Sequence, residues 1–120
     1  MAQLYKPSAL AEAVQTNSVV MFYADWCGHC QRLKPVFQEV SESLKAGALS
    51  NVHFGKVDYV KYGAAITDQR IGELEFGSPI SNEIRAFPTV MLFSQDGRKD
   101  SYSSGPNAAA MRDQFTSFFA

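Results

Sequence analysis

The 120-residue sequence lacks the features that would point to nucleic acid or to a membrane. Eleven Lys and Arg residues against twelve Asp and Glu residues leave a net charge of −1, so charge gives no reason to expect either partner. No apolar run approaches the roughly 20 residues that a membrane-spanning helix needs. Internal repeats and low-complexity segments are also absent. With 46% hydrophobic and 19% charged residues, the composition is that of a globular protein.

Cysteine is scarce, and both cysteines, Cys27 and Cys30, lie in one short motif. None is left for a structural disulfide, so the fold depends on its apolar core in either redox state. A chain of this length can bury one core but not two. We therefore expect residues 1–120 to form a single domain, either a whole protein or a piece of a longer chain. A monomer is the default expectation.

Histidine is scarce as well, which bears on the alternative that the Cys-x-x-Cys motif is half of a zinc site. Such a site usually needs two more cysteines or histidines at suitable spacing. Only His29 and His53 are present, and His29 lies between the two cysteines. We therefore expect no metal and no cofactor other than a redox-active Cys27–Cys30 disulfide.

The motif Trp26-Cys27-Gly28-His29-Cys30 lies between a strand pattern and a helix pattern. The apolar run at 19–23 is rich in β-branched and aromatic residues, as a buried strand is. After the motif, an apolar face follows helical spacing, comprising Leu33, Val36, Phe37, Val40 and Leu44. The cysteines are thus predicted to lie where a buried strand leads into a helix.

This position favours thiol chemistry at Cys27. The first turn of a helix has unpaired N–H groups and a dipole that stabilises negative charge, so the pKa of a cysteine there is lowered. Cys30 lies three residues further, at the spacing of neighbouring side chains on a helix. Cys27 is therefore predicted to be the nucleophile and Cys30 the more buried, resolving thiol. His29, when protonated, would favour a nearby thiolate and make the pair oxidising; the alternative is an exposed histidine without a task.

Further segments along nearly the whole chain join the cysteine motif in a resemblance to one protein family, and they occur in that family's order. They are Phe22-Tyr23-Ala24 before the motif, Pro35 within the helix, Lys56-Val57-Asp58, the segment 84–89, and Tyr102-Ser103-Ser104-Gly105. Together they resemble the catalytic domains of protein disulfide isomerase, within the thioredoxin superfamily. The resemblance implies an α/β thioredoxin-like fold and a thiol–disulfide oxidoreductase.

The resemblance also adds residues to the site. Pro88 matches the family's cis-proline, which faces the cysteine pair, and the backbone of Phe87 would bind an extended substrate. Arg85 matches an arginine that approaches the resolving cysteine and eases its deprotonation. Trp26 would serve as a packing residue, as an apolar platform for substrate, or as both. Gly28, which has no side chain, lets the substrate backbone come close.

The sequence departs from the family at one important position. Where the family carries a buried Glu or Asp that accepts a proton from the resolving cysteine, this chain has Met21. Asp25 is nearby, but in a position that we expect to be exposed. Lys56 is either buried beneath the site or a strand-end lysine that reaches water. Proton transfer from Cys30 is therefore expected to be slow or to use Arg85, Lys56 or water.

The predicted fold is a mixed β-sheet covered by helices on both faces. Expected strands are 4–6, 19–24, 52–58, 89–94 and 99–103, with an Asp96-Gly97 hairpin turn. Pro7 and Ser8 are expected to open the first helix, with Ser8 as its N-cap. A long helix is expected from about Cys27 to Lys45, and a final helix capped by Asn107 is expected to run through Phe118. The connection at about 59–83 is roughly ten residues longer than the resemblance implies. An extra amphipathic turn or two is expected there, with an apolar face of Ala64, Ala65, Ile66, Ile71 and Leu74. A tolerated surface insertion is the favoured interpretation, and a partner-binding flap is the alternative.

Three functions remain open from the sequence. The first is a disulfide isomerase-type oxidoreductase that acts on cysteine-containing proteins, with glutathione or a thiol oxidase or reductase as redox partner. The second is a thioredoxin-type cytosolic reductase, and the third is a binding module that uses the 59–83 segment. The Cys-Gly-His-Cys motif favours the endoplasmic reticulum or another secretory compartment. Residues 1–6 show no signal peptide and residues 117–120 no retention signal, so a cytosolic protein remains the alternative.

Overall fold

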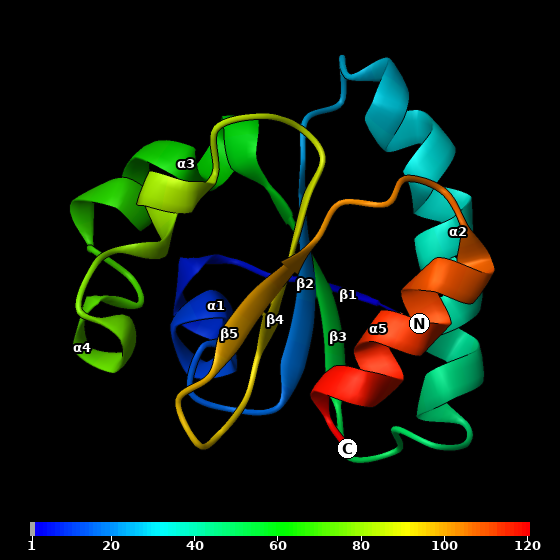
Figure 1. The fold of residues 1–120 in the computed structure, drawn as a ribbon. Coiled ribbons are helices and arrows are strands. Elements are labelled where there is room, and N and C mark those ends of the chain that lie inside the picture. Colours follow the sequence, from blue (N-terminus) through cyan, green and yellow to red (C-terminus); the bar gives the residue numbers. More distant parts are fainter. Residues whose placement is uncertain (1) are drawn as a thin grey trace.

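The computed structural model describes residues 2–120, which form one five-stranded mixed sheet (Figure 1). The strands are β1 (Gln3–Leu4), β2 (Ser18–Tyr23), β3 (His53–Asp58), β4 (Thr89–Phe93) and β5 (Lys99–Tyr102). They lie in the order β1-β3-β2-β4-β5. β3 runs parallel to both β1 and β2, whereas β4 is antiparallel to β2 and to β5. The predicted mixed sheet is confirmed, with the first strand at Gln3–Leu4 instead of 4–6.

Helices cover both faces of this sheet. α2 (Gly28–Lys45) and α5 (Ala108–Phe118) stand on one side in Figure 1. On the other side lie α1 (Pro7–Ala13), α3 (Tyr59–Asp68), α4 (Glu73–Phe76) and the 3-10 turn η1 (Ile80–Glu83). In residues 2–120 no helix is both long and apolar enough to cross a membrane.

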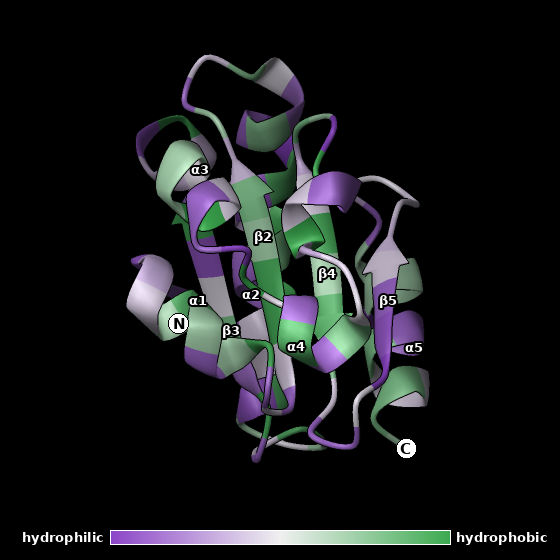
Figure 2. Ribbon diagram, turned by 90° about the vertical axis from the view of Figure 1, so that its left-hand side faces the viewer, coloured by the Kyte–Doolittle hydropathy of each residue, from purple (hydrophilic) through white to green (hydrophobic). Residues whose placement is uncertain are grey.

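β2 is the central strand, and all six of its residues are buried. Val19 and Met21 belong to the core on the α2 and α5 face, whereas Val20 and Phe22 belong to the core on the α1 and α3 face. Because neighbouring residues of a strand point to opposite faces, only a strand buried on both sides has this pattern. Figure 2 shows β2 and most of β4 as hydrophobic and the edge strand β5 as polar.

Two predicted helix starts are close to the observed ones, and one prediction is wrong. α2 begins at Gly28 with Cys27 as its N-cap, and the Asn107 side chain caps α5 through the N–H of Ala110. Ser8 is not an N-cap. α1 instead begins at Pro7, and its N-cap residue Lys6 makes no side-chain bond. Proline at the first helical position has the right φ and lacks an N–H that would otherwise be unpaired, so this helix starts without a side-chain cap.

The segment 59–83 folds into α3, α4 and η1, and it is part of the core. Ile66, Ile71 and Ile80 are each at most 5% exposed and join the cluster on the α1 face. Gly72 sits at φ +89°, and a side chain there would clash with Ile80. The expectation of a mere surface insertion is therefore wrong for these isoleucines. Leu74, predicted on the same apolar face, is 97% exposed because the chain reverses at Gly72.

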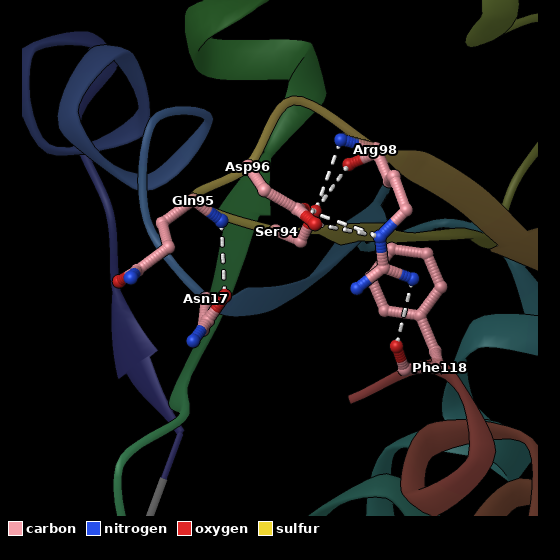
Figure 3. A network of polar contacts seen from close by, with 6 residues as sticks. All are labelled: Asn17, Ser94, Gln95, Asp96, Arg98 and Phe118. Carbon is pink, nitrogen blue, oxygen red and sulfur yellow. Dashed lines mark hydrogen bonds and ion pairs between the residues drawn. The ribbon is translucent and has the colours of Figure 1, made fainter. Parts of the chain in front are cut away.

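A polar network fixes the β4–β5 hairpin at the end of the sheet away from the cysteines (Figure 3). Asp96 accepts hydrogen bonds from Ser94 and Arg98, and Arg98 donates to the carbonyl of Phe118 at 3.0 Å. The Arg98 guanidinium also lies 4.7 Å from the centre of the Phe118 ring. The turn at Gly97, with φ +87°, matches the predicted Asp-Gly hairpin. The network thereby ties the hairpin to the end of α5.

Candidate functional site

The two cysteines lie where β2 leads into α2, at the upper end of the sheet in Figure 1. The Cys27 N–H donates to the carbonyl of Ala24 at 3.1 Å, which turns the chain sharply before the helix begins. Cys27 is 5% exposed, whereas Cys30, one turn into α2, is fully buried. Both are free thiols in this structure. Of the two cysteines, only Cys27 has any exposed surface.

The Cys27 sulfur has contacts on two sides. It accepts a hydrogen bond from the Cys30 N–H at 3.2 Å, which makes it the capping atom of α2. It also donates to the carbonyl of Phe87 at 3.3 Å. The Phe87–Pro88 peptide bond is cis, as the resemblance implied. The cysteine pair and the cis-proline segment therefore face one another across 60 residues of sequence.

The two thiols differ in acidity. Burial alone would raise the pKa of the Cys27 thiol, but three hydrogen bonds outweigh it: one from the Cys30 thiol and two from the N–H groups of Cys30 and His29. Together with the positive charge of Arg32, they lower the pKa of Cys27 below its ordinary value. Burial and the bond to Cys27 raise the pKa of Cys30 to about 11. Cys27 is thus the more readily ionised of the pair.

Two cations near the site were not anticipated from the sequence. Arg32 approaches His29 and acts on Cys27, and Lys34 lowers the pKa of Cys30 against the effect of burial. The Lys34 ammonium lies 4.1 Å from the centre of the Tyr23 ring and 3.8 Å from the Asp25 carboxylate. Arg32 follows Cys27 by five residues and Lys34 follows Cys30 by four, and this closeness along α2 was the sequence signal that could have identified them.

Arg85 bonds to its own segment in this structure. Its side chain is exposed and donates to the carbonyl of Asn82 at 3.0 Å. Asp25 is exposed, as expected, with 79% of its side chain accessible. Met21 is buried in the same cluster as both cysteines and pairs in register with the half-buried Lys56 on β3.

Aromatic rings border the Cys27 sulfur. Trp26 is 74% exposed, and its ring lies 5.9 Å from that of Phe87 in an edge-to-face arrangement. Tyr59, at the start of α3, continues the row with a ring centre 5.7 Å from Phe87. Trp26 and Phe87 were candidates from the sequence, whereas Tyr59 was not. The 59–83 segment therefore contributes one ring to the border of the site.

A groove of about 460 Å³ opens on the other side of Pro88. Its lining includes His29, Arg32 and Leu33 of α2, residues 88–91, Tyr102 and Gly105. Val90 and Met91 contribute apolar surface to the lining, and Arg32 and Glu83 contribute charged groups of opposite sign. A volume of this order is typical of ligand-binding clefts.

In the part of the chain that the structure describes, the side chains do not form a recognisable metal-binding cluster. Residues 2–120 contain no group of three or more His, Cys, Asp or Glu side chains arranged to hold a metal ion.

Comparison with known proteins agrees with this geometry. Residues 4–74 match the family model described as Thioredoxin. The chain is 35% identical over 107 residues to protein disulfide-isomerase A6 of Mesocricetus auratus, covering 85% of this chain and 20% of that protein. It is 36% identical over 78 residues to protein disulfide-isomerase TMX3 of Homo sapiens, covering 65% of this chain and 14% of that protein. The chain thus spans a fifth or less of these relatives.

Solved structures share the fold. Thioredoxin of Malassezia sympodialis superposes with a TM-score of 0.73 at 24% identity, covering all of this chain and 92% of that one. Human ERp44 superposes with a TM-score of 0.76 at 23% identity, covering 99% of this chain and 30% of that one. The fold, the paired cysteines and the family match lead to one conclusion: the chain belongs to the thioredoxin family, and it is homologous to domains of the protein disulfide isomerases.

Proposed function

We propose that this domain is a thiol–disulfide oxidoreductase of the disulfide isomerase type, acting on cysteine-containing proteins through Cys27 and Cys30. The observation that carries the proposal is the asymmetry of the pair. The sulfur with the lowered pKa caps α2 and faces the cis-proline segment, whereas its partner is buried with a pKa of about 11. A low-pKa nucleophile with a buried resolving thiol is the arrangement that thiol–disulfide exchange requires.

In the reductive direction, the Cys27 thiolate attacks one sulfur of a substrate disulfide. The substrate S–S bond breaks, a Cys27–substrate disulfide forms, and the other substrate sulfur leaves as a thiolate that takes up a proton. Cys30 then loses its proton and attacks the Cys27 sulfur. The Cys27–Cys30 disulfide forms and the second substrate thiol is released. Oxidation of a substrate dithiol follows the same steps in reverse. In isomerisation, another substrate thiolate attacks the substrate sulfur bonded to Cys27, so that a new substrate disulfide forms and the Cys27 thiolate is released.

The proton of Cys30 limits the second step. The pKa of Cys30 is raised to about 11, and Met21 in the same cluster cannot accept a proton. Lys34 is the cation that opposes the effect of burial on Cys30. We infer that resolution depends on water and on Lys34, and that mixed disulfides on Cys27 persist longer than they would beside a buried carboxylate.

The aromatic border and the groove give the substrate two contacts. Trp26 and Phe87 present apolar surface beside the reacting sulfur, and the groove beyond Pro88 accommodates the adjoining chain. The backbone on either side of the cis bond offers hydrogen bonds to an extended segment. We propose Gly28 as the position that keeps this approach free of a side chain.

We propose the redox partner and the compartment from the motif and the homology. The Cys-Gly-His-Cys motif and the homology to disulfide isomerases favour an oxidising, secretory compartment, with glutathione or a thiol oxidase accepting the electrons. A thioredoxin-type reductase remains the alternative.

Reduction potential separates the two. We expect a value near the −180 mV typical of protein disulfide isomerase and above the roughly −270 mV of thioredoxin, measured by equilibration in glutathione buffers. A value at the thioredoxin end would contradict the isomerase proposal and favour the reductase.

Substitution of each cysteine tests the roles. Cys27→Ser should abolish refolding of a scrambled disulfide protein, and Cys30→Ser should accumulate a mixed disulfide with the substrate, detected on non-reducing gels and by mass. The double substitution serves as the control. Tight complexes that survive in the double variant would contradict exchange and support a binding module.

A further inference from the structure

Arg32 lies two residues beyond the cysteine motif, and its side chain folds back over that motif. One guanidinium nitrogen, Nη2, contacts Nδ1 of His29. The other, Nη1, lies 3.9 Å from the point where a side chain on Gly28 would begin. Arg32 follows His29 by three residues and Gly28 by four along α2, the two spacings at which helical side chains are neighbours. The guanidinium therefore covers the turn between Cys27 and Cys30.

The chemistry of this contact assigns the proton on His29. An arginine side chain only donates hydrogen bonds and keeps its proton at any pH that a folded protein experiences. In the contact with Arg32, Nδ1 of His29 is therefore the acceptor and carries no proton. The permanent positive charge next to the motif then belongs to Arg32.

The other charged groups around Cys27 do not take this role. Lys34 lies between the Tyr23 ring and the Asp25 carboxylate, and its effect is on Cys30. From the facing segment, Cys27 meets the backbone carbonyl of Phe87. The buried thiol of Cys30 hydrogen-bonds to Cys27, and Glu83, which lines the same groove as Arg32, pairs with Lys99 at 3.0 Å. The Arg32 charge also reaches the rim of the groove beyond Pro88, where it lines the wall together with His29.

We propose that Arg32 is a positioning residue that stabilises the Cys27 thiolate with a fixed charge and holds His29 with Nδ1 as acceptor. The inference rests on the proposed exchange chemistry of Cys27 and adds the group that tunes it. Stabilising the thiolate stabilises the reduced pair, so Arg32 makes the pair more oxidising. Because the charge does not titrate, this contribution persists through the pH range in which histidine loses its proton.

The first test measures the Cys27 thiolate directly. In the reduced chain, the pH midpoint of alkylation of Cys27 by iodoacetamide, followed by peptide mass, should move upward in Arg32→Gln. The reduction potential should become more negative in the same variant. Arg32→Lys should restore part of both shifts, because it keeps the charge but not the planar fork.

Arg112→Gln is the matched control. It removes an arginine that pairs with Glu39 at 3.7 Å. Glu39 lies twelve residues after Cys27 along α2, so the helical rise separates this ion pair from Cys27 by about 18 Å. We expect no shift of the midpoint in this control. The shift in Arg32→Gln should shrink in 1 M salt, where the Debye length falls to about 3 Å.

Several results would overturn the proposal. They are an unchanged midpoint in Arg32→Gln at low salt with a normal circular dichroism spectrum, no rescue by Arg32→Lys, and a shift of equal size in Arg112→Gln. A nitrogen-15 spectrum that places the His29 proton on Nδ1 would also overturn it. Failure of the wild-type chain to exchange with glutathione would instead overturn the proposed function, because the alkylation midpoint reports on Arg32 whether or not the chain turns over.

Discussion

At the scale of single residues, Met21 shows most clearly how this chain differs from the family pattern. It is 1% exposed, lies in the same cluster as both cysteines and pairs in register with Lys56. A thioether packs well and cannot take up a proton. The position therefore serves the core at the expense of proton transfer from Cys30.

Met21→Glu should reverse that balance. We expect faster resolution of the Cys27 mixed disulfide, because a carboxylate near Cys30 can accept its proton, and a loss of about 2 kcal/mol in the free energy of unfolding from burying a polar group. Stopped-flow release of a fluorescent thiol and urea unfolding measure the two effects. Met21→Gln is the matched control, polar but unable to act as base; acceleration in that variant too would argue against proton transfer.

The pKa of Cys30 predicts an alkaline loss of stability in the reduced chain. Burial raises this pKa from 9.0 to about 11, so the folded state keeps a proton that the unfolded state loses. The stabilising effect is then complete below pH 9 and is lost between pH 9 and 11, and it amounts to about 3 kcal/mol at most. Urea unfolding of the dithiol form at several pH values tests this. The disulfide form, which has no thiol to titrate, should lack this decline; a matching decline there would assign the effect to other groups.

Residue-scale prediction from the sequence was uneven. Cys27, Cys30 and the cis bond at Pro88 follow from a local motif and a resemblance. Arg32 could not be assigned, because its role depends on a side-chain rotamer that turns the guanidinium back over Gly28. Arg85 was expected near Cys30, but its backbone position lets it bond to the carbonyl of Asn82 instead.

At the scale of elements, the segment 59–83 is where pattern alone was least informative. Its strand and helix neighbours have clear periodicity, and β2, α2 and α5 were predicted to within two residues. In 59–83 the apolar residues come from three short pieces whose directions are set by Gly72 and Gly77, both at positive φ. No single helical period spans such a chain reversal, so Leu74 was assigned to the wrong side.

Truncation of one side chain tests whether this segment belongs to the core. Ile66→Ala should lower the free energy of unfolding by about 2–5 kcal/mol, since Ile66 is fully buried and its removal leaves a cavity. Leu74→Ala is the matched control and should change stability by less than about 0.5 kcal/mol, because Leu74 is 97% exposed. Chemical denaturation of both variants decides it. Equal effects would mean that the segment packs differently from the arrangement described.

At the scale of the whole molecule, the sheet separates two apolar clusters, and only one of them contains the cysteines. Both sulfurs belong to the cluster shared with α2 and α5. The fold class was predictable because β2 is apolar on both faces and the helices alternate with strands. The sequence did not predict which of the two apolar clusters would contain the cysteines, because that depends on which face of the sheet each helix covers.

Folding stability and redox state are therefore linked. If the folded pair is more oxidising than the same cysteines in the unfolded chain, the reduced form must be more stable to unfolding than the oxidised form, by about 1.4 kcal/mol for every 30 mV. Parallel urea titrations of both forms measure this difference. A more stable oxidised form would contradict the oxidising character proposed for Cys27 and Cys30.

The double duty of the Cys27 sulfur has one more consequence. The atom that exchanges electrons is also the acceptor for the backbone N–H that starts an 18-residue helix. Each turnover replaces an anionic acceptor at that amide with a neutral sulfur, so the amide resonance of Cys30 becomes a built-in gauge of the redox state. Its chemical shift and its solvent exchange would follow the reaction in real time, without any label attached to the protein.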